Sequence, residues 1–381
     1  MMHTTTCHWT KETGWNLPTT PATPPQLVLY FGATSQLDGN APAVRELTAR
    51  FPEAMVCGCS TAGEILGNRV FDESVVAALV QFKSTRVRAV AESTDGNADS
   101  HAIGRRAAEK LKASDLRHVL VLSDGLSVNG TALVSGFSEI VAPGAAITGG
   151  LAGDGSRFQK TFVGLGNEVK RNQIVAIGFY GPDMVIGYGS RGGWEGFGPR
   201  RRITRSQGNT LLELDDQPAL ALYKRYLGER AAGLPATGLL FPLELTKDAA
   251  EKAGLVRTIL AVDEARQSLT FAGDMPEGWY ARLMKASGDQ LVGGAANAGS
   301  EAVRKTDAAG SSLAILVSCV GRRLVLGQRI EEELEAVIRT LPDKTEVVGF
   351  YSYGEACPSV GNPASELHNQ TMTITLIGER A

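Results

Sequence analysis

The sequence predicts a mixed α+β protein of the broad α/β class, with two domains in which helices cover mixed β-sheets. At 381 residues the chain exceeds the size at which a single core stops growing, so two domains are expected. Short apolar runs typical of strands alternate with segments whose apolar residues recur at helical spacing. This alternation lacks the regular strand–helix–strand cadence of a doubly wound sheet, and mixed sheets are therefore favoured over one parallel sheet.

The first domain is expected over residues 26–228. Residues 1–25 are polar and end in Pro-Ala-Thr-Pro-Pro, which indicates a loose or disordered arm. Strands are predicted from apolar and alternating runs at 27–31, 55–59, 74–82, 86–92, 118–122, 145–148, 173–180, 184–190 and 202–205. Helices are predicted at 41–50, 100–112, 130–141 and 215–227, the last opening with an acidic cap and a proline.

The second domain is expected over residues 229–381. The segment 228–235 is rich in Gly, Ala and Pro, which breaks the pattern and marks the boundary. The predicted elements are a hairpin at 256–262 and 268–271, helices at 278–286 and 331–341, and strands at 313–319, 346–358 and 365–379.

Composition excludes several classes of protein. The hydrophobic content of 43%, charged content of 21% and net charge of −3 are ordinary for a globular protein and give no reason to expect nucleic-acid binding. Five cysteines form no disulfide framework, which fits a reducing compartment. The start of the chain lacks the pattern of a signal peptide, and no apolar run could span a membrane. We therefore expect a cytoplasmic protein without a membrane partner.

Polar turns after buried strands are the candidate ligand site. Ser352, Tyr353, Gly354 and Glu355 follow an apolar run at 347–350, where a rigid sheet can hold polar groups over a crevice. The segment 56–70 is a looser copy, in which Ser60, Gly63 and Glu64 take the positions of Ser352, Gly354 and Glu355. Two such copies predict two related halves that face one site.

A glycine-rich loop at 149–155 joins this candidate site through Gly150, Gly153 and Asp154. It matches neither phosphate-binding glycine pattern, so we interpret it as close backbone packing around a ligand or another strand. The segment 293–297 is expected to play the same part in the other half. The cluster Arg200, Arg201, Arg202 and Arg205 is either a solvated face or an anion-pairing surface.

Four separated motifs resemble the FIST domain pair, an N-terminal and a C-terminal FIST module in tandem. They are GGLAGDG at 149–155, SCVGRRLVLGQRIEEELEAV at 318–337, FYSYGE-CP at 350–358 and ELHNQTMT at 366–373. The resemblance extends over residues 26–379. It implies a cytoplasmic small-ligand sensor that regulates a bacterial histidine kinase or cyclic-dinucleotide enzyme, and it adds Arg322 and Asn369 to the ligand-binding candidates.

The chain is also similar to the nitric-oxide-sensing haemoproteins built on the same domain pair. This similarity implies bound haem, and Cys357 and His368 are the residues of axial-ligand type inside the motifs. The structural alternative is a buried cysteine at a strand end and a histidine whose ring caps a neighbouring carbonyl.

Three other interpretations stay open at this point. The chain is an amino-acid or metabolite sensor without haem, a hydrolase that uses Glu64 or Glu355 as general base, or a scaffold with a vestigial pocket. The sequence also leaves open a homo-oligomer.

Overall fold

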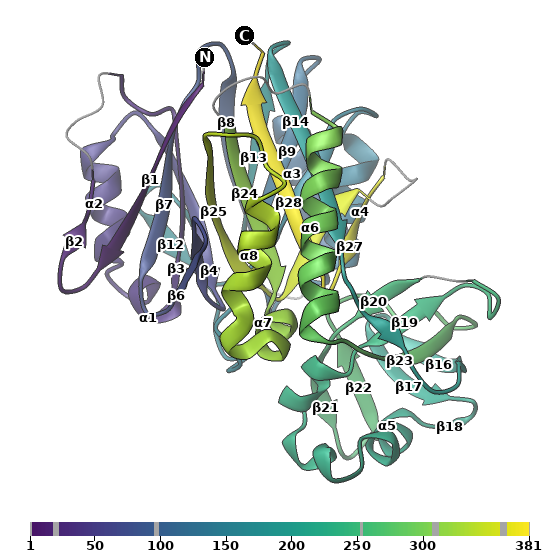
Figure 1. Ribbon diagram of the computed structural model, residues 1–381. Coiled ribbons are helices and arrows are strands. Elements are labelled where there is room, and N and C mark those ends of the chain that lie inside the picture. Colours follow the sequence, from purple (N-terminus) through teal and green to yellow (C-terminus); the bar gives the residue numbers. More distant parts are fainter. Residues whose placement is uncertain are drawn as a thin grey trace.

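The protein has two parts, a body built from three similar units and a single inserted unit (Figure 1). The computed structural model describes residues 2–17, 23–94, 99–251, 254–306, 312–358 and 364–380. We call residues 3–81 unit 1, residues 86–180 unit 2, and residues 184–191 together with 288–379 unit 3. Residues 195–285 form the inserted unit, which hangs below α6 in Figure 1. The fold class predicted from the sequence, mixed sheets covered by helices, is confirmed.

Each unit of the body repeats one four-stranded plan. The second and third strands are parallel, and the fourth strand runs antiparallel between the second and the first. In chain order these strands are β1(His3–Thr10), β3(Leu27–Ala33), β4(Met55–Thr61) and β7(Val75–Gln81) in unit 1; β8(Arg86–Ser93), β9(Leu116–Ser123), β10(Ala146–Leu151) and β13(Gln173–Tyr180) in unit 2; and β14(Met184–Arg191), β24(Ser312–Cys319), β25(Thr345–Ser352) and β28(Met372–Glu379) in unit 3. The body is therefore built with pseudo-threefold symmetry.

The three units exchange hairpins in a closed cycle. Each hairpin leaves the third strand of its own unit and pairs with the third strand of another. Unit 1 sends β5(Glu64–Leu66) and β6(Arg69–Phe71) to β25, unit 3 sends β26(Gly354–Pro358) and β27(Ser365–His368) to β10, and unit 2 sends β11(Val163–Leu165) and β12(Glu168–Lys170) to β4. Because every third strand is covered by a neighbour, the units form one body.

Helices make the parallel crossovers that the plan requires. The second and third strands are joined through α2(Pro42–Arg50), α4(Gly130–Ile140) and α8(Ile330–Ile338), and the second strand is preceded by α3(Ser100–Leu111) in unit 2 and α6(Gly288–Arg304) in unit 3. Short elements complete the body: β2(Gly14–Trp15), α1(Thr34–Leu37), α7(Val320–Leu326) and η3(Gly327–Arg329). Within the described ranges, no helix is long and apolar enough to cross a membrane.

Side-chain caps define where the longer helices begin. Asp99 accepts the backbone N–H of His101 at the start of α3, and Asn129 accepts that of Ala132 at the start of α4. Ser287 opens α6 with a capping box completed by Gln290. Such caps satisfy backbone N–H groups that the first helical turn leaves without partners.

The inserted unit interrupts unit 3 between β14 and α6. Its elements are β15(Glu195–Gly196), β16(Arg201–Gln207), β17(Thr210–Leu214), β18(Gln217–Pro218), α5(Ala219–Leu227), η1(Gly228–Gly233), η2(Ala236–Leu240), β19(Leu243–Thr246), β20(Leu255–Arg257), β21(Ile259–Asp263), β22(Ser268–Phe271) and β23(Tyr280–Lys285). They enclose a hydrophobic core of their own that includes Leu220, Tyr223 and Phe271. The boundary expected at 228–229 falls inside this unit.

Three sequence predictions differ from the structure. The helix predicted over 278–286 is wrong: β23 lies here, paired on both sides with β19 and β16, so tertiary pairing decides its conformation. The arm expected to be loose contains β1, which pairs with β7 along its length and buries Cys7 and Trp9. The segment 293–297 lies in α6 and is not a second glycine loop.

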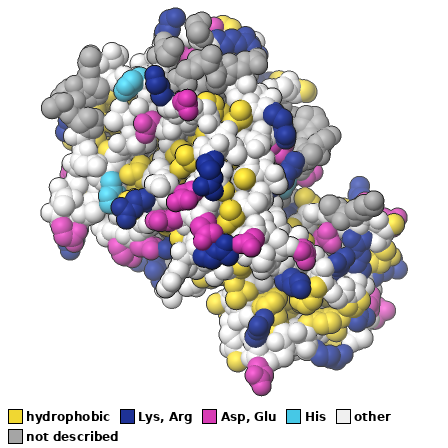
Figure 2. Space-filling view, in the orientation of Figure 1, with side chains coloured by type: hydrophobic (Ala, Val, Ile, Leu, Met, Phe, Trp, Pro, Cys, Tyr) yellow, Lys and Arg dark blue, Asp and Glu magenta, His cyan; other side chains and the backbone are white. Residues whose placement is uncertain are grey.

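The main core lies where the sheets of all three units meet. It contains Leu29 from unit 1, Leu120 from unit 2 and Ile315 from unit 3. Phe31 and Phe350 stack across it with ring centroids 4.7 Å apart. On the face shown in Figure 2, acidic and basic side chains are interspersed over the body, and hydrophobic side chains gather on the inserted unit.

We predict that Gly349→Ala destabilises the body, because a Cβ at this position would lie 1.9 Å from the Leu316 carbonyl oxygen on the adjacent strand. Overpacking of this kind costs about 1–3 kcal/mol or more. Gly293→Ala is the matched control, because this exposed helical position has open space around it, and alanine there is expected to stabilise by about 0.5–1 kcal/mol. Urea unfolding of both variants measures the difference, and equal free energies of unfolding would contradict the packing argument.

Candidate functional site

Three polar turns, one from each unit, converge at the centre of the body. Each follows a third strand and ends in glycine and a carboxylic acid: 61–64 in unit 1, 151–154 in unit 2 and 352–355 in unit 3. Backbone hydrogen bonds link neighbouring turns, from Gly153 N–H to the Ser60 carbonyl at 3.0 Å and from Tyr353 N–H to the Leu151 carbonyl at 3.1 Å. The link from Ala62 N–H to the carbonyl of Tyr351 closes the ring at 2.8 Å. We call this arrangement the central junction.

Glu64 and Glu355 occupy equivalent buried positions in this junction. Glu64 accepts hydrogen bonds from Thr61 and, at 2.9 Å, from the Ser74 hydroxyl. Glu355 accepts them from Ser352 and, at 3.0 Å, from the Thr371 hydroxyl. Burial raises the pKa of each carboxyl from 4.5 to about 8, against the lowering effect of these hydrogen bonds. Both carboxyls are therefore mostly protonated at neutral pH.

The hydroxyl that contacts each glutamate lies three residues before it. Thr61 is thus the counterpart of Ser352, and the predicted equivalence of Ser60 with Ser352 is wrong by one residue. Ser60 has a different part, because its hydroxyl donates to the Gly153 carbonyl and accepts Phe162 N–H.

The turn of unit 2 departs from the pattern. Leu151 stands where the other turns carry a hydroxyl, and Asp154 turns instead to the backbone N–H groups of Phe158 and Gln159, both at 2.8 Å. The Tyr353 hydroxyl donates to the Asp154 carboxylate, and the Tyr353 ring stacks on Phe158 at 4.5 Å between centroids.

The central junction is closely packed. Glu64 is 1% exposed and Glu355 is fully buried. A Cβ at Gly153 would lie 2.9 Å from the Ala62 nitrogen, and one at Gly150 would lie 2.6 Å from a methyl group of Val317. The structure therefore brings the predicted turn residues together, but it packs them against one another.

An open cleft of about 560 Å³ lies at the edge of the body, between unit 3 and the inserted unit. This volume is in the range of small-molecule sites. The body contributes the end of β14, β27 and the segment leading into β28, and the inserted unit contributes β20 and its flanking loops. The lining residues are Ser190, Arg191, Gly192, Leu245, Lys247, Glu251, Gly254, Leu255, Val256, Trp279, Pro358, Glu366, His368, Asn369 and Thr371.

Two of the residues predicted from the sequence, His368 and Asn369, line this cleft. Asn369 also bridges the two sides, because its amide accepts Thr258 N–H of the inserted unit and donates to the Tyr353 carbonyl at 3.3 Å. Thr371 lines the cleft and donates to Glu355 behind it. The cleft wall and the central junction are therefore in direct hydrogen-bonded contact.

Charged and aromatic groups of the cleft were not found by sequence reasoning. Lys247 places its ammonium 5.8 Å from the centroid of the Trp279 ring, and Arg191 pairs with Glu301 at 2.8 Å. Glu251 contributes a carboxylate from the same loop region as Lys247. Lys247, Glu251 and Trp279 belong to the inserted unit, which no motif marked.

The two candidate haem ligands differ in their chemistry. Burial raises the pKa of the Cys357 thiol well above its usual value, which opposes the thiolate that iron would need. His368 shares a hydrogen bond at 3.0 Å between Nε2 and the Cys357 carbonyl, and burial lowers the pKa of the ring. A neutral imidazole held in this way has Nδ1 as its remaining donor atom for a metal. His368 therefore fits an axial ligand and Cys357 does not.

Arg322 lies outside the cleft lining and is fully buried against Glu333. The basic cluster at 200–205 is largely compensated: Arg200 pairs with Glu244, Arg201 with Asp215 and Arg205 with Glu213. Among the described residues, no group of three or more His, Cys, Asp or Glu side chains could hold a metal ion.

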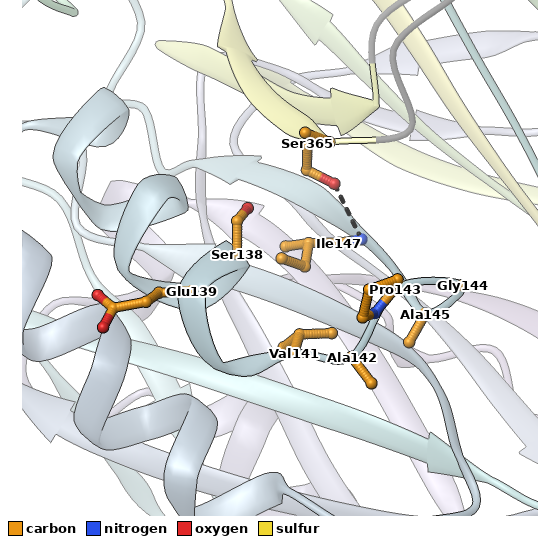
Figure 3. A pocket seen from close by; sticks show the side chains of 10 residues that line it. Ser138, Glu139, Val141, Ala142, Pro143, Gly144, Ala145, Ile147 and Ser365 are labelled. Carbon is orange, nitrogen blue, oxygen red and sulfur yellow. Dashed lines mark hydrogen bonds between the residues drawn. The ribbon is translucent and has the colours of Figure 1, made fainter.

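Two of the further cavities border β27 or the cleft. One, of about 350 Å³, adjoins it and shares the walls Gly192, Gly254 and Val256. The other, of about 320 Å³, lies at the end of α4 (Figure 3). Ser365 borders the latter, but its hydroxyl already accepts Ile147 N–H at 3.1 Å, as the dashed line in Figure 3 marks. The cleft has the richer set of polar groups.

Comparisons with known proteins identify a family. The FIST N domain model matches residues 26–217, and the FIST C domain model matches residues 219–358. No curated protein matches this sequence. A crystal structure of cyanuric acid hydrolase from A. caulinodans covers 100% of both chains at 8% identity with a TM-score of 0.34, which is too low to inform fold or function.

We predict that the two buried glutamates make stability fall as the pH rises. A carboxyl whose pKa is raised in the folded state contributes stability that is fully present below pH 4.5 and is lost as the pH rises through about 8. Glu64→Gln with Glu355→Gln preserves the shape of the protonated acids, and it should flatten the decline in the urea midpoint between pH 5 and pH 9. Glu229→Gln, at an exposed position, is the control. Parallel pH profiles for all three proteins would contradict the assignment.

Proposed function

Because the chain belongs to the FIST family, we propose that it is a sensor that binds a small ligand in the cleft between unit 3 and the inserted unit. FIST domains are small-ligand sensory domains of signalling proteins. The observation that carries the proposal is the cleft itself, which is lined by residues of both the body and the inserted unit. A ligand that contacts both sides favours one relative position of the two parts.

The cleft favours a small polar metabolite with groups of both charges. Lys247 and Arg191 suit a carboxylate, and Glu251 suits an amino group. Trp279 also lines the cleft and provides apolar surface for the rest of the ligand. An amino acid or a related metabolite meets these requirements.

Haem is the second candidate, and the position of His368 supports it. The residue lies on the cleft wall, and its ring is oriented by the Cys357 carbonyl. Bound haem would supply an iron that takes up nitric oxide. In this variant His368 would hold the group, and the cations Arg191 and Lys247 would supply positive charge for its propionates.

Ligand binding would change the activity of a signalling partner by changing the position of the inserted unit. We infer that the partner is a bacterial histidine kinase or a cyclic-dinucleotide enzyme. The ligand must prefer one state over the other, and coupling of about 1–3 kcal/mol is typical. Asn369 and Thr371 extend the effect to the central junction, because each contacts both regions.

A hydrolase that uses Glu64 or Glu355 has less support. Both carboxyls are buried, mostly protonated at neutral pH and outside the cleft lining. A general base must reach the proton that it removes.

We predict that Lys247→Ala weakens binding of a carboxylate ligand by about 10- to 100-fold, the usual cost of a lost charged hydrogen bond. The measurement is isothermal titration with L-amino acids and short dicarboxylates that raise the melting temperature of the wild type. Lys224→Ala is the control, because Lys224 lies in the same unit and pairs with Glu264. No stabilisation of the wild type by any member of the panel, or equal losses in both variants, would count against the carboxylate proposal.

The haem proposal predicts that His368→Ala abolishes a nitric-oxide-sensitive Soret band and that Cys357→Ala retains it. The measurement is visible absorption after addition of haemin to the purified protein, before and after nitric oxide. If the wild type shows only the absorbance of free haemin, the protein does not bind haem and the haem proposal is wrong. If wild type and His368→Ala give equal spectra, His368 is not the axial ligand.

A further inference from the structure

The chain crosses between the body and the inserted unit twice, and the two crossings lie side by side. We call residues 192–194 the exit crossing, and we call residues 286–291, which run into the first turn of α6, the return crossing. Gly193 has φ +93°, and a Cβ there would lie 2.2 Å from the Gln290 carbonyl oxygen. A Cβ at Gly294 would lie 2.7 Å from the Gly192 carbonyl oxygen. Glycine at both positions therefore allows the exit crossing to pack directly on the start of α6.

One buried side chain holds both crossings. Arg322, in α7, donates through Nη1 to the Gly192 carbonyl and through Nη2 to the Leu291 carbonyl at 2.8 Å. Its remaining donors face Glu333 on α8, with Nε at 3.1 Å and Nη2 at 2.9 Å from the carboxylate. The side chains of Arg322 and Glu333 are both fully buried.

The body in turn fixes Glu333. Ser318 at the end of β24 donates to the carboxylate at 3.2 Å, and Tyr351 at the end of β25 donates to the same oxygen at 2.8 Å. The guanidinium is thus attached to two strands of the rigid body on one side and to both crossings on the other. A planar guanidinium can make these divergent contacts at once, whereas a lysine ammonium is a single point charge.

The exit crossing also forms part of the cleft. Gly192 is a wall of the 560 Å³ cleft and of the adjoining 350 Å³ cavity. We propose that Arg322 is a positioning residue: it sets the angle of the inserted unit, and with it the width of the cleft, without touching the ligand. The proposal rests on the proposed function only in taking the cleft as the ligand site.

The neighbouring arginine provides a matched control. Arg323 lies in the same helix but pairs with Asp72 at 2.6 Å and donates to the Ala62 carbonyl, both in unit 1. It is an arginine with comparable hydrogen bonds that contacts neither crossing. Its loss should affect the body and leave the inserted unit in place.

The test measures the distance between the body and the inserted unit in the absence of ligand. The method is pulsed electron paramagnetic resonance on the full chain. Spin labels are attached at Arg225→Cys on α5 and Glu109→Cys on α3, both exposed positions. The five native cysteines are buried, and burial raises the pKa of Cys7 and Cys57 to about 12, which slows their reaction with the label. The test variant is Arg322→Met with Glu333→Leu, because an apolar pair often replaces a buried ion pair without loss of stability.

We expect the test variant to keep the wild-type circular dichroism spectrum and to broaden the distance distribution at least twofold. Arg322→Lys should broaden it to a smaller extent, and Arg323→Met should leave it unchanged. A wild-type distribution in the folded test variant would overturn the proposal; if that variant does not fold, a wild-type distribution in Arg322→Lys would overturn it. No ligand is added in this distance measurement. Its outcome therefore does not depend on whether the cleft binds a ligand in the other experiments.

Discussion

The closed exchange of hairpins is the constraint on which the rest of the structure depends. Each third strand is completed by a hairpin from another unit, and the chain leaves each third strand through a turn at the central junction. The three turns must therefore meet, and they meet where solvent is excluded. Glu64 and Glu355 remain compatible with this burial because each is held by a hydroxyl three residues earlier and by a second hydroxyl before the fourth strand.

This constraint also explains why the candidate site lies at the edge of the body. A junction closed by backbone hydrogen bonds is a rigid support, and its turns have little room to admit a ligand. The insertion in unit 3 creates a second surface beside β27, so the cleft arises where the pseudo-threefold symmetry is broken. His368 is the last residue of β27 and Asn369 follows it, and both lie in a family motif and line the cleft.

Much of the fold was predictable because buried strands have a local signature. The apolar runs at 27–31, 118–122 and 313–319 correspond to β3, β9 and β24. Pairing between distant segments has no such signature, so neither the exchange of hairpins nor the position of β14 beside β28 was predicted. The strand β23 was taken for a helix because its neighbours β16 and β19 are distant in sequence.

The candidate site was predictable only in part, for a similar reason. Family motifs mark His368 and Asn369, whereas Lys247 and Trp279 come from an insertion without any motif. The threonine that contacts Glu64 could have been found, because a hydroxyl precedes the glutamate by three residues in both turns.

Hydrogen–deuterium exchange with and without a saturating ligand tests most directly whether the ligand occupies the cleft or the central junction. If the cleft holds it, protection should appear in β20, in β27 and around residues 190–192, while the three central turns remain unchanged. Protection confined to residues 61–64, 151–154 and 352–355 would contradict this account.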